Sequence, residues 1–413
     1  MKKMKRSCTV ISLLILFAMA FNMVSCIVKD EENVQDLMDD ITPREVTALD
    51  SLDSDNAVIT DFALRLFKAS NDDGENTLIS PLSVLYALAM AANGAEGETL
   101  AQMEDLFGMS VDELNLYLHT YLDSLPQSEK CKLGIANSIW IDDTFGPKQE
   151  FLQTNADYYG ADIYKLPFDN KAVADINNWV KKETEGMISE IIEKIPDGAV
   201  MYLINALVFE AEWQRIYLAD NVKEGVFTRE DGTEQTVEFM CGIDEEYIEG
   251  ENATGFVKYY KDSKYAFVAL LPNEDISVAE YVQTLDVASL NAMLTNHVSC
   301  DALYTMLPKF KSEYSVDMVD TLKSLGMTDA FDEHADFSKI AEGISISAVL
   351  HKTYIEVAEK GTKAAAVTAV ENYYSGIPTE IKYVYLDRPF VYMIIDCENN
   401  IPVFIGTVME VNQ

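Results

Sequence analysis

One stretch near the C-terminus constrains the fold of this chain more than any other. Between Gly361 and Val370 it reads GTKAAAVTAV, a run of small residues without the Asn, Asp and Pro that fix tight turns. At the two-residue period of a β-strand, the even positions from Thr362 to Val370 are uncharged and small or medium-sized, whereas Lys363 falls on the other face. The run can therefore become a buried central strand of a sheet without burying a charge.

The residues on both sides of this run also follow a recognisable pattern. Tyr354 to Val357 alternates like a strand before it, and two tyrosines and a Ser375-Gly376 pair follow it. The run resembles the hinge of the inhibitory serpins, with the matching residues Glu359, Gly361, Thr362, Ala364, Ala365 and Ala366. An Ala-rich linker is the alternative explanation for this stretch when it is taken alone.

Composition sets limits on the class of protein. Hydrophobic residues make up 48% of the 413 residues, which is ample for a large folded core. The chain carries 69 acidic and 31 basic residues, a net charge of −38. Removal of residues 1–25, which contain four basic and no acidic residues, would change that charge to −42. Such a surface repels nucleic acid and anionic lipid, so nucleic acid binding is excluded.

The N-terminus is typical of a targeting signal. Four basic residues precede an apolar run, Val10 to Met23, that is short for a membrane span and ends in Ser25-Cys26. This ending resembles the bacterial lipobox, which implies cleavage before Cys26 and lipidation of its new N-terminus. An ordinary secretory signal, with Cys26 incidental, is the alternative. We therefore expect residues 1–25 to be a signal peptide, residues 26–55 an acidic solvated tether and residues 56–413 the folded domain.

This signal predicts an exported bacterial lipoprotein at the outer membrane or the cell surface, whose only membrane contact is the lipid. A secreted or periplasmic protein is the alternative, and the face of the membrane stays open.

Enzymatic, metal and cofactor functions find little support in the sequence. There is no GxSxG motif and no histidine at a catalytic spacing, so the chain is not expected to be an enzyme. No CxxC pair or His/Cys cluster predicts a metal site, and no cofactor is expected. Export permits disulfides, but the sequence does not decide between thiols and disulfides for Cys131, Cys241, Cys300 and Cys397.

From residue 56 the pattern predicts one large α+β domain. Ser80 is expected to cap a helix that has Pro81 in its first turn. Further expected helices are 56–69, 174–192 with a break at Gly186, and 316–325 closed by Gly326. Expected strands are 133–141, 201–214, 265–272, 344–357 and the hairpin 390–395 with 403–408. No repeat or linker interrupts this span, which favours a single domain.

The serpin resemblance extends over nearly all of that domain. Seven blocks, from INNWVKKETEGMI to LDRPFVYMI, occur in the order of the family. The family fold has helices packed around a large central mixed sheet plus smaller sheets, with an exposed reactive loop at about residues 359–385. Matching the family's motifs assigns a shutter, a buried hydrogen-bonded group beneath the sheet, to Ser80, Ser83, Asn205 and His351. It assigns the breach, at the top of the sheet, to Trp213.

What the resemblance implies is a suicide-type inhibitor that traps a serine protease as a covalent acyl-enzyme. Cleavage of the loop would free the segment from Gly361 to about Tyr374, which would then add a central strand to the sheet. The expected partner is a target serine protease, or alternatively a cysteine protease, and the inhibitor is expected to be a monomer. A non-inhibitory serpin that acts as a binding or carrier module is the alternative function.

The bond that the protease cuts is expected at Ser375-Gly376. Loop length counted from Gly361 and the match of Ile377-Pro378 to residues that follow the cut in some serpins give the same position. Ser375 suits elastase-like or subtilisin-like pockets and Tyr374 a chymotrypsin-like pocket, whereas trypsin-like targets are not expected because no Lys or Arg lies between residues 363 and 382. The natural target, whether a host or a bacterial protease, is not identified by the sequence.

Overall fold

The computed structural model describes residues 34–71, 74–125, 131–261, 263–362 and 380–412. It divides into two compact units, residues 1–35 and residues 36–413, and the helices and the candidate site lie in the second. The helices are α2 (Asn56–Ser70), α3 (Pro81–Ala92), α4 (Gly97–Phe107), α5 (Val111–Asp123), α6 (Gln149–Tyr159), α7 (Asn170–Glu183), α8 (Val278–Thr284), α9 (Val287–Thr295) and α10 (Val319–Ser324). Single 3₁₀ turns occur at Ala219–Asn221 and Asp329–Phe331.

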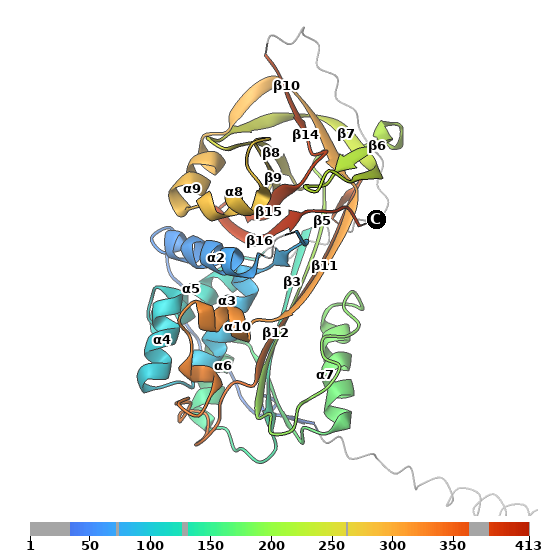
Figure 1. The fold of residues 1–413 in the computed structure, drawn as a ribbon. Helices are drawn as coiled ribbons and strands as arrows, with labels where there is room; N and C mark the ends of the chain where they lie inside the picture. The colour runs from blue at the N-terminus through green and yellow to red at the C-terminus, as the bar shows by residue number, and fades with distance from the viewer. Residues whose placement is uncertain (1–33, 72–73, 126–130, 262, 363–379, 413) are drawn as a thin grey trace, which may run out of the picture. The chain divides into compact units, whose positions relative to one another are not determined.

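The first sheet is mixed and provides the frame for the site. Across its width the strand order is β4 (Asp162–Leu166), β3 (Cys131–Asp142), β5 (Met201–Glu212), β13 (Gly361–Thr362), β12 (Ala348–Ala358) and β11 (Phe310–Asp317). Residues Met201 to Phe209 of β5 are buried on both faces, as a central strand requires. Helices cover both faces of this sheet. Figure 1 shows α3 to α6 on one face and α7 on the other.

The second sheet is formed by a separate set of strands. Its order is β14 (Ile381–Tyr385), β10 (Val298–Pro308), β7 (Glu234–Glu249), β8 (Ala253–Tyr259), β9 (Tyr265–Pro272), β15 (Phe390–Asp396), β16 (Ile401–Val408) and β2 (Leu78–Ile79), and β6 (Val222–Thr228) also pairs with β7. The hairpin of β15 and β16 is the one that the sequence predicts.

Helix α3 lies at the centre of the helical layer because its sequence is apolar all round. Each of its twelve residues is buried, which is the expected environment for a helix without a polar face. Ser80 caps it as predicted, with its hydroxyl accepting a hydrogen bond from the backbone N–H of Ser83, and Pro81 occupies the first turn. The cap places both serines directly under the first sheet.

Three segments differ from the sequence-based expectation. Helix α7 ends at Glu183, and residues 187–192 are irregular rather than helical. Residues 310–317 form strand β11, so the helix expected from residue 316 begins only at Val319. Residues 381–385, at the end of the expected loop of about residues 359–385, form strand β14 and pair with β10.

The expected solvated tether is also shorter than predicted. Within residues 36–55 the side chains of Leu37, Met38 and Ile41 pack against the core, although the segment is acidic. Arg44 donates to Asp157 from its side chain at 2.8 Å and from its backbone N–H at 2.7 Å. Spaced apolar side chains and this ion pair attach the segment to the domain, so the folded body begins near residue 36.

Candidate functional site

The hinge residues Gly361 and Thr362 form strand β13, which is wedged between two strands of the first sheet. Below this point β5 and β12 pair directly and in parallel, from Ala348 opposite Tyr202 to Tyr354 opposite Val208. Above it β13 is antiparallel to both strands: Thr362 lies opposite Ala211 on β5 and opposite Val357 on β12. The sheet is thus open at one end of the β5–β12 junction, with the hinge in the opening.

Glycine is required at position 361 by the close approach of β5. A Cβ atom at this position would lie 1.9 Å from the carbonyl oxygen of Ala211, and the backbone φ is +149°. Both features exclude an L side chain without movement of the backbone. The match of Gly361 to the serpin hinge therefore has a local steric reason.

Thr362, the first even position of the predicted hinge, points into the protein. Its side chain is fully buried, and its hydroxyl lies 2.7 Å from the hydroxyl of Tyr260, which is also fully buried. Directly opposite residues of an antiparallel pair point to the same face, so the even hinge position faces the protein interior together with Ala211 and Val357. The remaining predicted hinge residues Ala364, Ala365 and Ala366 lie outside the described residues, as do Tyr374, Ser375 and Gly376 of the expected reactive bond.

Trp213 holds the turn that leads into β13. Its backbone N–H donates to the carbonyl oxygen of Lys360, and its indole N–H donates to that of Ala358, both at 2.8 Å. The indole stacks on Tyr260, with ring centroids 4.3 Å apart, and Tyr260 in turn contacts Thr362. Trp213, which the serpin resemblance assigns to the breach, therefore connects the end of β5, the turn and β13.

An ion pair fixes the outer side of the same turn. Lys309, between β10 and β11, lies 3.0 Å from the carboxylates of both Glu359 and Glu238. Charged pairs that are partly exposed contribute little stability each, but here they fix the direction in which the chain enters the sheet. Glu359, the first residue of the predicted hinge, thus has a positioning contact.

The four predicted shutter residues meet beneath the β5–β12 junction. His351 of β12 lies directly opposite Asn205 of β5, and their side chains are hydrogen-bonded to each other. The amide nitrogen of Asn205 donates to Ser83 of α3, and the backbone N–H of Ser80 donates to the His351 ring at 3.2 Å. All four side chains are completely buried.

The hydrogen bonds also fix the protonation state of His351. Because Nε2 accepts from the Ser80 N–H, Nδ1 must carry the single proton and donate it to the Asn205 oxygen. Burial disfavours the charged imidazolium and lowers the pKa of His351 to about 3. The ring is therefore neutral at physiological pH, as a hydrogen-bonded histidine in a core must be.

The geometry links the shutter to the opening of the sheet. The Asn205–His351 bond crosses the same β5–β12 junction that β13 enters. His351 is one of the seven β12 residues, from Ala348 to Tyr354, that pair directly with β5. Neighbouring strands are about 4.8 Å apart. A third strand between β5 and β12 would double their separation and break this side-chain bond.

Sequence reasoning missed two members of the site. Asn137 of β3 belongs to the shutter, since it accepts a hydrogen bond from Asn205 and donates one to the Ser83 carbonyl oxygen at 3.2 Å. Tyr260 belongs to the breach through its contacts with Trp213 and Thr362. The one signal that could have identified Asn137 from the sequence is a polar Asn inside the apolar β-rich run 133–141.

The sequence left the state of four cysteines open. In this structure no disulfide is formed by Cys131, Cys241, Cys300 or Cys397.

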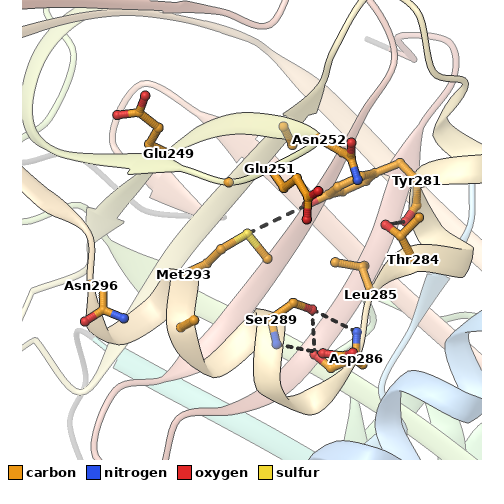
Figure 2. Close-up of a pocket in the computed structure, with 13 residues that line it drawn as sticks. Glu249, Glu251, Asn252, Tyr281, Thr284, Leu285, Asp286, Ser289, Met293 and Asn296 are labelled. Atoms are coloured by element: carbon orange, nitrogen blue, oxygen red, sulfur yellow. Dashed lines mark hydrogen bonds between the residues drawn. The ribbon is translucent and has the colours of Figure 1, made fainter.

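A pocket of about 430 Å³ lies elsewhere, between the β7–β8 turn and helices α8 and α9 (Figure 2). Its lining includes Glu251, Tyr281, Asp286 and Met293, and none of the predicted site residues.

Among the residues that the structure describes, no group of three or more His, Cys, Asp or Glu side chains is arranged to hold a metal ion. Within the same residues no helix combines the length and apolar character needed to cross a membrane.

Comparison with known proteins gives one consistent result. The family model described as Serpin (serine protease inhibitor) matches residues 57–411. The cattle (Bos taurus) protein Serpin B10 is 30% identical over 394 residues, which cover 84% of this chain and 97% of that protein. The native-state crystal structure of Tengpin, a thermophilic serpin, is 50% identical with a TM-score of 0.88, covering 92% of this chain and all of that one. Human thyroxine-binding globulin in complex with thyroxine has a TM-score of 0.81 at 24% identity, covering 88% of this chain and all of that one, which is a likeness of fold.

Proposed function

This chain belongs to the serpin family, and we propose that it is an inhibitory member, which traps a serine protease as a covalent acyl-enzyme by inserting its own cleaved loop. The observation that carries the proposal is β13. The hinge already occupies the opening between β5 and β12, and its buried face is small and uncharged. An insertion that has begun in the intact protein needs only a free end to continue.

The register of β13 predicts where each following residue would lie. Because Thr362 is opposite Ala211 and Val357, each further step along the loop moves one residue back along both neighbours. Thr368 would then lie between Asn205 and His351, the two residues whose bond must break. The even positions between them, Ala364 and Ala366, would face the helical layer beneath the sheet.

Insertion is downhill because it adds a strand and buries apolar surface. Each backbone hydrogen bond gained contributes roughly 0.5–1.5 kcal/mol. Over about a dozen residues, with burial of the even face, the gain is on the order of 10 kcal/mol, comparable to the whole stability of a typical domain. The intact form is therefore held kinetically, by the β5–β12 pairing and the shutter.

The covalent step takes place at the Ser375-Gly376 bond. The protease serine oxygen attacks the Ser375 carbonyl carbon, the peptide C–N bond breaks, and Gly376 leaves as an amine that takes up a proton. Residues up to Ser375 are then ester-linked to the protease and free to insert. If insertion outruns hydrolysis of the ester, the protease is carried along with the strand and distorted, and one inhibitor is consumed.

The loop sequence favours particular proteases. Ser375 is small and suits elastase-like and subtilisin-like enzymes, while Tyr374 suits chymotrypsin-like ones. Cysteine proteases, which also form acyl-enzymes, are a second target class. Productive cleavage after Lys363 or Lys382 would contradict this assignment.

The test is direct. The purified protein is mixed with elastase, chymotrypsin or subtilisin, and denaturing electrophoresis should show a covalent complex together with a one-to-one loss of protease activity. The control is the same mixture with a protease whose active-site serine has been blocked, which should give no complex. Cleavage of the loop without any trapped protease would contradict the inhibitory function.

A second function deserves comparison because thyroxine-binding globulin, a binding protein, shares the fold. A carrier serpin would need no loop insertion, and its melting temperature would stay nearly constant after loop cleavage. Gly361 and the buried Thr362 favour insertion, since neither is needed by a binding module.

We also propose that Cys26 is lipidated and attaches the domain to a membrane of the exporting bacterium. The support is the basic start, the apolar run and Ser25 before Cys26. A Cys26→Ser variant should move from the membrane fraction to the soluble fraction and should lose incorporation of labelled fatty acid. An unchanged distribution would contradict the anchor.

A further inference from the structure

The end of the second sheet carries an exposed face on which six described side chains are uncharged. Strands β14, β10 and β7 pair in that order, and their registers place six outward side chains in two rows. We call these six residues the tyrosine face: Ile243, Tyr304 and Tyr383 in the first row, and Cys241, Met306 and Tyr385 in the second. Tyr383 is 58% exposed and Ile243 is 55% exposed.

The strand register places these six side chains on the surface, while their neighbours along the same strands point into the core. Val384 and Thr305, which point to the other face of the same strands, are buried. The exposed rings are ordered among themselves: Tyr304 stacks on Tyr383 with centroids 5.5 Å apart, and Tyr383 meets Tyr385 edge-on at 5.9 Å. In a chain of net charge −38, such an ordered apolar surface is typical of a protein contact, where Tyr and Met are enriched.

The chain connects this face to the reactive bond. β14 begins at Ile381, five residues after Gly376, and five residues span at most about 18 Å. A protease bound to the Ser375-Gly376 bond must therefore lie close to the start of β14. A second copy of this chain fits the face less well, because two bodies with a net charge of −38 each repel.

We propose that the tyrosine face is a docking surface for the target protease. The protease contacts this face with an uncharged, apolar part of its own surface. That part lies on the side of the protease that binds the loop residues after the cleaved bond. This inference rests on the proposed inhibitory function and adds a second contact to that of the loop. Because the contact lies outside the loop, it increases the rate of association without changing how the loop inserts.

The experiment compares two variants with one matched control. Tyr383→Ser and Ile243→Ser each remove one exposed side chain from a different strand of the face. Val226→Ser removes a side chain that is also exposed, at 47%, from β6 of the same sheet, outside both rows. The probe is whichever of chymotrypsin, elastase and subtilisin the unaltered protein traps fastest, and the second-order association rate constant and the stoichiometry are measured at 0.1 M and 1 M NaCl.

We expect association to slow about tenfold in Tyr383→Ser and several-fold in Ile243→Ser, which is the range for aromatic and aliphatic interface residues. Val226→Ser should behave like the unaltered protein, and the stoichiometry should not change in any of the three. The ratio of rates should be the same at both salt concentrations, because an apolar contact is not screened.

Three results would overturn the docking surface. Unchanged rates in both variants, with a covalent complex still formed, would reject it and leave the inhibitory function standing. Cleavage of the loop of the unaltered protein without any trapped protease would reject both. Sedimentation that shows self-association of the unaltered protein, lost in Tyr383→Ser with no change in rate, would assign the face to a second copy instead.

Discussion

The hydroxyl groups of Thr362 and Tyr260 lie 2.7 Å apart in a site from which water is excluded. Thr362 belongs to the hinge and Tyr260 to the end of the second sheet, next to Trp213. This contact holds the first residues of the loop inside the first sheet while the rest of β5 and β12 remain paired. In the proposed mechanism, it is the point at which insertion either continues or stops.

Thr362→Arg should convert the protein from an inhibitor into a substrate. The arginine would have to enter a fully buried position, and an unpaired buried charge costs several kcal/mol. Insertion would then be slower than hydrolysis of the acyl-enzyme. Titration of the trapping protease should show most of its activity retained, and electrophoresis should show cleaved loop without complex.

The matched control for this variant is Val226→Arg, which adds the same charge at an exposed position of β6. It should inhibit with the original stoichiometry. Full inhibition by Thr362→Arg would mean that the hinge does not insert on its even face.

Gly361→Ala should expel β13 from the sheet. The added methyl group would lie 1.9 Å from the carbonyl oxygen of Ala211, at a backbone φ that alanine avoids. Hydrogen exchange at the Thr362 amide should become faster and inhibition slower. Gly146→Ala is the control, because a methyl group there meets no atom within 4 Å and its φ is ordinary, and it should change neither measurement. Unchanged protection of Thr362 in Gly361→Ala would contradict the described hinge.

Much of this site could be predicted from the chain because its residues carry local signals. The run of small residues predicted a hinge strand, of which the structure describes Gly361 and Thr362 as β13, and Ser80 with Pro81 predicted the start of α3. Tyr260 could not be found in this way, since it meets Thr362 across 102 positions of sequence and occurs at no informative spacing.

The segment before residue 56 was misjudged for a related reason. Its acidic composition predicts a solvated tether, but composition does not report where single apolar side chains such as Leu37 and Ile41 find partners. The ion pair of Arg44 with Asp157 also joins positions 113 residues apart. Contacts of this kind depend on the folded surface that receives them.

Acid should weaken the shutter through His351. Its pKa is about 6.5 in an unfolded chain and about 3 in the fold, where burial opposes the charged form. Between pH 6.5 and pH 3 the unfolded chain therefore binds one more proton than the native state, so stability falls as the pH falls. The stability that neutral His351 contributes is fully present above pH 6.5, and its loss toward pH 3 is on the order of a few kcal/mol.

Denaturation midpoints at pH 7 and pH 5 check this expectation. The drop between them should be smaller in His351→Gln, which does not titrate, than in the unaltered protein. The carboxylates titrate alike in both proteins and cancel in the comparison. His334→Gln, at an exposed histidine whose pKa its neighbour Asp332 raises, should not reduce the drop. An equal drop in His351→Gln would mean that the shutter histidine is not the acid-sensitive group.

Thr368→Val should destabilise the cleaved, inserted form and leave the intact form unchanged. Insertion separates Asn205 from His351 by two strand spacings, about 10 Å, so their mutual bond is lost. If the register of β13 continues, Thr368 lies between them. Its hydroxyl can then form hydrogen bonds with the Asn205 and His351 side chains, which have lost their bond to each other. A valine of similar size fills the space but offers no hydrogen bond, which costs roughly 1–3 kcal/mol when the groups are buried.

Melting temperatures before and after loop cleavage measure this effect. The unaltered protein should gain greatly in thermal stability on cleavage, and Thr368→Val should gain several degrees less from an equal starting point. Thr379→Val is the matched control, because position 379 follows the reactive bond and does not insert, so its gain should equal that of the unaltered protein. If Thr368→Val gained as much as its control, the register of insertion would differ from that of β13, and the opening of the sheet would not pass through the Asn205–His351 pair.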